Sequence, residues 1–137
     1  MTPDERTAAV LEQVLGLPLH RALGIALVDD GDPAAGVQVT VGPGIVNPAG
    51  VLHGGLVPLL LDVAGFLALL PRLPLDRHAV TVSTASSIIA AARTGDVVRV
   101  EAVVDRLGRT QAFLSGRLLV GEKVVATGQV VKAVVAV

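Results

Sequence analysis

Hydrophobic positions between residues 47 and 70 predict one buried helix. They recur at three- and four-residue steps, which is the spacing of one face of an α-helix. Pro58 has no N–H and fits only a first helical turn, so we place the start of the helix at Gly54 to Gly55. The apolar positions are Leu56, Leu59, Leu60, Val63, Phe66, Leu67 and Leu70.

Two features of this helix predict chemistry. Asp62 is the one charged residue in it, and burying an unpaired charge costs several kcal/mol. Its carboxylate is therefore expected to be hydrogen-bonded, paired, exposed in a cleft or functional. Gly54 and Gly55 open the helix with backbone amides alone, at the positive end of its dipole. These amides form a candidate oxyanion hole.

The spacing of these groups predicts a dimer. Asp62 lies seven residues beyond Gly55, which is roughly 10 Å along the helix axis at about 1.5 Å per residue. A single substrate carbonyl does not easily touch both groups. The simplest hypothesis is a two-fold dimer in which one subunit supplies the glycine amide and the other supplies the carboxylate.

A second, shorter helix is predicted at the N-terminus. Residues 2–16 begin with Thr2 as N-cap, and Glu5 completes a capping box. Gly16 and Pro18 are expected to end this helix. We expect it to serve as a packing or lid helix without chemistry of its own.

The remainder of the chain predicts an antiparallel sheet. Apolar and polar residues alternate with a period of two, and Gly- and Asp-rich turns separate the runs. Strands and helices do not alternate along the chain, so the fold class is α+β, with about six strands around one long helix. The predicted strands are 24–30, 35–41, 79–90, 97–107, 110–120 and 124–135.

Composition limits the partners. The chain is 52% hydrophobic yet has only two Phe and no Trp or Tyr, so we expect an aliphatic core and an oligomer interface. A net charge of −1 without a basic block argues against nucleic acid. The longest apolar run, 56–70, contains Pro58 and Asp62 and is shorter than the ~20 residues of a membrane span. The absence of cysteine makes a cytoplasmic location the default, and the three histidines lack the spacing of metal ligands.

One constellation of residues resembles a known family. It is similar to the hotdog-fold acyl-CoA thioesterases of the phenylacetate-pathway type, within the 4-hydroxybenzoyl-CoA thioesterase-like superfamily. The likeness extends over most of the chain and implies a single hotdog domain, residues 1–137, whose sheet wraps around the long helix. The residues that carry it are Asn47, Gly50, His53, Gly54, Gly55, Asp62, Ala64 and Gly65.

The resemblance implies hydrolysis of an acyl-CoA to free acid and coenzyme A. Asp62 would act as general base or nucleophile, the amide of Gly54 or Gly55 would polarise the thioester carbonyl, and Asn47 would orient the water or the carbonyl. No cofactor is implied beyond the coenzyme A portion of the substrate. A thiol leaving group has a pKa of about 8.5 and departs without a strong general acid. A site with one carboxylate, one asparagine and backbone amides is therefore sufficient for a thioester.

Three further residues complete the predicted site. His53 is expected to contact the substrate or to organise the glycine loop. Thr81 aligns with a family position where a Ser or Thr often lies near the nucleophilic water, and an ordinary β-branched strand residue is at least as good an interpretation. Arg109 is a weaker candidate for the coenzyme A phosphates. We expect a homodimer, assembling into a homotetramer as a dimer of dimers; the alternative function is a non-catalytic acyl-CoA-binding hotdog module.

Overall fold

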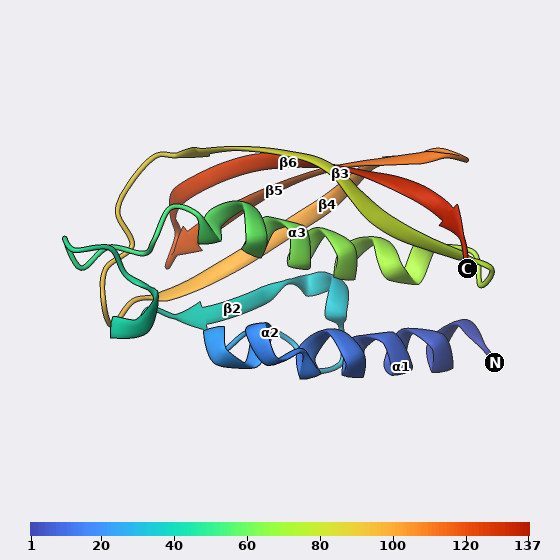
Figure 1. The fold of residues 1–137 in the computed structure, drawn as a ribbon, viewed down its shortest axis with the longest axis horizontal. Helices are drawn as coiled ribbons and strands as arrows, with labels where there is room; N and C mark the ends of the chain where they lie inside the picture. The colour runs from blue at the N-terminus through green and yellow to red at the C-terminus, as the bar shows by residue number, and fades with distance from the viewer.

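One antiparallel sheet wraps around the long helix α3. A computed structural model describes residues 1–137, and its strands are ordered β1-β2-β4-β5-β6-β3. Figure 1 shows α3 lying along the sheet, with α1 and α2 on the side away from strands β3 and β6. The elements are α1 (Pro3–Gly16), α2 (Pro18–Leu23), β1 (Ala26–Leu27), β2 (Val37–Thr40), α3 (Leu56–Leu69), β3 (Arg77–Ile88), β4 (Val97–Leu107), β5 (Gln111–Val120), β6 (Lys123–Ala136) and the 3₁₀ turns η1 (Pro33–Ala35), η2 (Pro43–Ile45) and η3 (Leu70–Arg72).

Helix α3 confirms the interpretation of its sequence. It starts after Gly55 as N-cap, and Pro58 falls in the first turn. Most of its side chains are buried, as expected of a helix that lies against a curved sheet, and the half-buried Leu59, Asp62 and Phe66 share one face. The sheet approaches α3 most closely at Gly116 and Gly128, where an added Cβ would lie 2.7 and 2.6 Å from the methyl groups of Leu61. Glycine at these two positions lets the strands curve over the helix.

The four long strands lie within a few residues of their predicted bounds, and β4 has the predicted bounds. Strand β3 forms one edge of the sheet and pairs only with β6. A register shift between Thr81 and Ser83 leaves Val82 as an extra residue in β3. Such a β-bulge re-aims the side chains beside it. The six-stranded sheet around one helix is the predicted hotdog arrangement.

The segment after α1 corrects two expectations. Pro18 does not simply end the first helix but opens a second one, α2, because proline is well suited to the first helical position. The predicted strand 24–30 is only two residues long, and the strand predicted at 35–41 is Val37–Thr40. Asp32 caps the 3₁₀ turn η1, which occupies the end of the turn expected between strands 24–30 and 35–41 and the first residue of the second of these strands.

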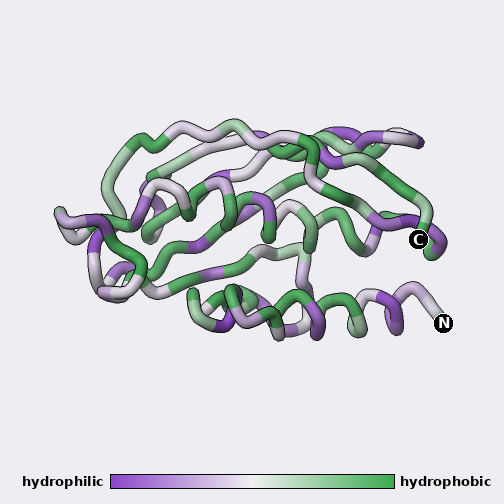
Figure 2. The backbone as a smooth tube through the Cα atoms, viewed as in Figure 1, coloured by the Kyte–Doolittle hydropathy of each residue, from purple (hydrophilic) through white to green (hydrophobic).

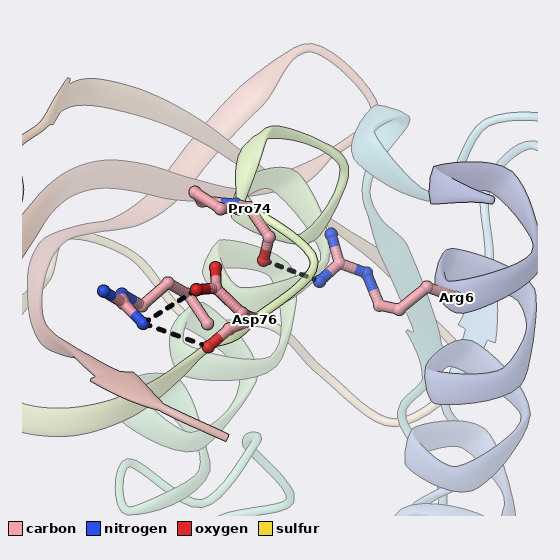
Figure 3. A network of polar contacts seen from close by, with 4 residues as sticks. Arg6, Pro74 and Asp76 are labelled. Carbon is pink, nitrogen blue, oxygen red and sulfur yellow. Dashed lines mark hydrogen bonds and ion pairs between the residues drawn. The ribbon is translucent and has the colours of Figure 1, made fainter. Parts of the chain in front are cut away.

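A buried arginine attaches α1 to the end of α3. The capping box at Thr2 and Glu5 forms as predicted. Figure 2 shows hydrophobic and hydrophilic residues alternating along α1, as in a helix with one packed face. Figure 3 shows Arg6 reaching from α1 to the carbonyl of Pro74. Its guanidinium also donates to the carbonyls of Leu70 and Leu73, at 2.9 and 2.7 Å. No helix of the fold has both the length and the hydrophobicity to cross a bilayer.

Candidate functional site

Asp62 forms a closed triangle of polar contacts with two other side chains. The hydroxyl of Thr81 donates to Asp62 Oδ1 at 2.7 Å, and the ammonium of Lys132 donates to the same oxygen at 2.7 Å. Lys132 also donates to Thr81 Oγ1 at 3.0 Å. The carboxylate is therefore both paired and hydrogen-bonded, while its side chain stays 34% exposed. Three elements, α3, β3 and β6, supply one residue each.

The sheet register explains why these three groups meet. Thr81 and Lys132 are directly paired across β3 and β6, so their side chains lie on the same face of the sheet. Ala112 on β5 pairs with Lys132 on its other side, and it is fully buried. Its small side chain leaves room for the lysine stem. Phe66, one helical turn beyond Asp62, presents its ring to the ammonium, 5.5 Å from the ring centroid.

Lys132 is the residue that the sequence interpretation missed. Its side chain is only 3% exposed, an unusual position for a lysine. A signal was present: Lys132 has the same inward-facing parity along its strand as the buried residues Ala126 and Val130. A lone cation on an inward strand face and a lone acid in an apolar helix are each costly alone. Together they predict a pair.

The glycine loop holds its two amides in different states. The N–H of Gly55 donates to Nδ1 of His53 at 3.0 Å, so this amide is committed within the loop. The N–H of Gly54 donates to no group in the chain. Of the two amides expected at an oxyanion hole, Gly54 is therefore the one available to a ligand. His53 is exposed and organises the loop through its ring nitrogen.

Asn47 stabilises the loop that precedes the glycines. Its side-chain carbonyl accepts from the amides of Ala49 and Val51, at 3.0 and 3.2 Å. Gly50 completes this turn with a φ of 75°, a conformation that glycine adopts without strain. The two hydrogens on Asn47 Nδ2 have no partner in the chain. Asn47 thus stabilises the turn through Oδ1 and still has a free donor at Nδ2.

The two halves of the predicted site lie at opposite ends of β3. Asp62 contacts Thr81 near the start of the strand. Gly54 lies beside Ile88 at its end, where an added Cβ would come within 3.0 Å of the Ile88 side chain. One protomer therefore does not bring Asp62 together with the glycine loop, in line with the spacing argument from sequence.

Arg109 lies in the turn between β4 and β5, exposed and without an ion-pair partner. The sheet pairing brings this turn close to Lys132. Ala112, just after the turn, pairs with Lys132, and the carbonyl of Thr110 accepts from the amide of Val134. Arg109 is thus at the Asp62 end of the sheet. Its side chain makes no hydrogen bond or ion pair with the other predicted site residues.

Two cavities lie along the sheet, and only the smaller one is near a predicted site group. The larger, about 680 Å³, contains none of the predicted site residues. It lies on the face of the sheet away from α3, since its lining residues Ser115 and Arg117 flank the helix-facing Gly116. The smaller, about 20 Å³, is entirely apolar and is lined by Ile88 together with Val57 and other aliphatic residues. It is the cavity next to the glycine loop.

Comparison with known proteins decides the family. A family model described as "Thioesterase superfamily" matches residues 49–127, more than half of the chain. The chain belongs to the thioesterase superfamily. The residues that match the superfamily model include Gly54, Gly55, Asp62 and Thr81. The match ends before Lys132.

Two curated relatives also match the thioesterase-superfamily chain. A Pseudomonas aeruginosa protein provisionally named an esterase is 40% identical over 82 residues, which cover 59% of this chain and 60% of that protein. A Deinococcus radiodurans protein, likewise provisionally named an esterase, is 36% identical over 90 residues, covering 66% of this chain and 59% of the relative. The match therefore spans about three fifths of either relative's length.

Solved structures share the fold over nearly the whole chain. The thioesterase HI1161 of Haemophilus influenzae has a TM-score of 0.83 at 24% identity, over 92% of this chain and 88% of its own. The BH2602 protein of Bacillus halodurans, crystallised with CoA, has a TM-score of 0.80 at 23% identity, over 97% and 85%. A mutant form of the phenylacetic acid degradation protein PaaI of Thermus thermophilus has a TM-score of 0.75 at 27% identity, over 85% and 97%.

Proposed function

We propose that this chain hydrolyses acyl-CoA thioesters at a site shared between the two subunits of a homodimer. The observation that carries the proposal is the separation of the two half-sites along one edge strand. Asp62 is held beside Thr81, while the uncommitted Gly54 amide lies beside Ile88. A reaction that uses both groups needs a second copy of the chain.

Antiparallel pairing of β3 with β3 of a second copy would meet this need. A two-fold axis between Thr84 and Ala85 would set Thr81 of one subunit opposite Ile88 of the other. The Asp62 of each subunit would then face the glycine loop of its partner, giving two equivalent sites. Strand β3 is suited to such pairing, because it is twelve residues long and lies at the sheet edge. Its outer residues include Val82 and Ile88, which are 57% and 58% exposed.

The chemistry follows from the free atoms of each half-site. The Gly54 amide donates to the thioester oxygen as negative charge develops there, and Asn47 Nδ2 orients the same oxygen or the water. Asp62 Oδ2 either takes a proton from the water that adds to the carbonyl or adds to the carbonyl itself. When Asp62 acts as base, the C–S bond then breaks and the proton held by Asp62 passes to the departing thiolate. If Asp62 adds directly, the thiolate leaves as the C–S bond breaks; water then cleaves the resulting anhydride, which releases the free acid, regenerates the carboxylate and supplies the proton that the thiolate takes up.

An aliphatic acyl group is the better fit. The chain has only two Phe and no Trp or Tyr, so it offers few rings on which an aryl group could stack. The cavity beside Ile88 is lined by Val, Leu, Ile and Ala side chains, and at about 20 Å³ it has room for about one water molecule, so the partner subunit would have to supply most of the acyl pocket. The coenzyme A carrier is supported by the superfamily and by the CoA in the Bacillus halodurans structure. Arg109, exposed at the Asp62 end of the sheet, is proposed to meet its phosphates.

The first experiment measures thiol release from a panel of acyl-CoAs, from short aliphatic to long and aryl. We expect turnover of short aliphatic substrates, with a loss of at least ~100-fold in Asp62→Asn if the carboxylate takes part in the chemistry. Circular dichroism controls for folding. Binding of acyl-CoA without thiol release by the wild-type chain would contradict the proposal and favour the binding-module alternative.

The second experiment tests the shared site by complementation. Asn47→Asp keeps the side-chain oxygen that accepts from both loop amides and removes the Nδ2 donor. Two-tag purification isolates heterodimers of Asn47→Asp with Asp62→Asn, in which one site has both native residues and the other has neither. Such heterodimers should recover about half of wild-type turnover, whereas each homodimer is inactive. Inactive heterodimers would refute sharing across the interface.

A further inference from the structure

We propose that Lys132 is a positioning residue for Asp62, fixing which carboxylate oxygen faces the substrate. The inference rests on the proposed function, because it assigns Lys132 a role in that same site. Lys132 lies on β6 beyond the stretch matched by the superfamily model. Its ammonium would not touch the substrate.

The triangle of contacts determines the direction of each hydrogen bond. Lysine has three donors and no acceptor, so its bonds to Asp62 and Thr81 both run outward from the ammonium. Thr81 Oγ1 uses a lone pair to accept from Lys132, and its single hydrogen points at Asp62 Oδ1. Lys132 therefore orients the threonine hydroxyl as well as the carboxylate.

Both donors converge on one carboxylate oxygen. Oδ1 accepts from Thr81 and from Lys132 at 2.7 Å each, while Oδ2 accepts no hydrogen bond from the chain. A carboxylate held by two donors on one oxygen cannot rotate without breaking both bonds. Oδ2 is thereby left as the atom presented outward, in a side chain that is one-third exposed. This arrangement selects the reactive oxygen before a substrate arrives.

The surroundings of Lys132 favour positioning over a surface ion pair. Its side chain is 3% exposed, so water has little access to the ammonium itself. The ammonium is also 5.5 Å from the centroid of the Phe66 ring, and Asp62 is the one carboxylate that it contacts. Charge-assisted hydrogen bonds in such a place are short, and they are stronger than neutral ones.

The test compares Lys132→Met with Arg6→Met, which removes the other buried cation far from Asp62. Lys132→Met should lower kcat by about 10- to 100-fold, the range expected for hydrogen bonds to a charged group, and change KM by less than about threefold. Arg6→Met should keep kcat within about twofold. In the Asp62→Asn background, Lys132→Met should have no further effect, since Lys132 acts through the carboxylate.

A rescue experiment separates the charge from a structural role. The chain has no cysteine, so Lys132→Cys introduces a single thiol. Alkylation with bromoethylamine in denaturant, followed by refolding, rebuilds an ammonium at nearly the same reach, and iodoacetamide adds a neutral amide. The aminoethyl form should recover at least a third of wild-type kcat, and the amide form should not. Wild type carried through the same treatment controls for refolding.

The outcomes distinguish this inference from the function on which it rests. If Asp62→Asn is inactive but Lys132→Met keeps kcat within threefold, Lys132 is structural and the inference fails while the proposed function stands. The inference about Lys132 also fails if the aminoethyl and amide forms of Lys132→Cys recover kcat equally. It fails as well if the aminoethyl form recovers no activity while wild type taken through the same treatment is active. If Asp62→Asn retains full turnover, the proposed function itself fails.

Discussion

Arg6 and Lys132 are the two charged side chains that the fold buries, at 8% and 2% exposure, and they are held in different ways. Arg6 donates only to backbone carbonyls at the end of α3 and in the turn beyond it. Lys132 donates to a carboxylate and a hydroxyl. Similar burial therefore accompanies two different kinds of partner, and the partner decides what the cation can do.

The carbonyls around Arg6 have no further role once they are bonded. Groups at the C-terminus of a helix lack intrahelical donors, and a cation there also interacts favourably with the helix dipole. Asp62 differs because it keeps one free oxygen after binding Lys132. Arg6 satisfies the hydrogen bonding of its carbonyl partners and so stabilises the fold. Lys132 leaves Oδ2 of Asp62 free for a ligand, so it also sets the geometry of a site.

The largest expected effect is on stability at the buried ion pair. Asp62→Asn leaves the Lys132 ammonium buried without a counter-charge, which should lower the free energy of unfolding by about 3 kcal/mol. Adding Lys132→Met removes that charge and should restore most of the loss. Urea unfolding at fixed protein concentration measures the cycle. If the two substitutions destabilise additively, the pair is not coupled and the comparison with Arg6 fails.

A smaller loss is expected at the other cation. Arg6→Met should lower the free energy of unfolding by about 2 kcal/mol, because it leaves the carbonyl of Leu73 without a donor and that of Leu70 with only the amide of Leu73, at 3.3 Å. Turnover at a temperature where the variant is folded should stay close to wild type. A matched drop in kcat would show that α1 communicates with the site, and would remove the distinction between the two cations.

The sequence predicted the long elements because their patterns are local. The apolar spacing of α3, the capping box at Thr2 and Glu5, and the alternation along β4 each depend on neighbouring residues only. Where two local signals competed, the prediction was wrong. Pro18 is compatible with both the end of one helix and the start of another, and the structure uses it as a start.

The site was only partly predictable because its contacts are not local. Asp62 and Lys132 are 70 residues apart, and their pairing depends on β6 lying beside α3 and β3. The interpretation of Asp62 named pairing as one option but had no partner to offer. A search for lone charges at inward positions would have found Lys132. It would also have found Arg6, one turn before the half-buried Val10 on the packed face of α1.

An exposed ion pair offers the weakest contrast with the buried one. Glu101 on β4 accepts from Arg117 of β5 at 3.0 Å and from Arg99 at 3.2 Å. The hydrogen bond from Arg117 is the main cause that lowers the pKa of Glu101 below its ordinary value of 4.5, with Arg99 contributing and desolvation opposing. The Arg117 side chain is 53% exposed, against 3% for Lys132, so solvent screens this pair much more than the pair at Asp62.

Glu101→Gln should therefore have the smallest effect, a loss of roughly 0.5 kcal/mol in the free energy of unfolding at pH 7. Because the folded pKa lies below the unfolded one, this stability is present above about pH 4.5 and is lost as pH falls through the folded value. Urea unfolding of wild type and variant should differ at pH 7 and converge once the pH has fallen below the folded-state pKa of Glu101, with Glu122→Gln, an exposed acid without an ion pair, as control. Added salt at about 1 M should also abolish the difference at pH 7, since it screens exposed charges. The coupling between Asp62 and Lys132 should survive the same salt, and its loss would mean that water reaches the buried pair.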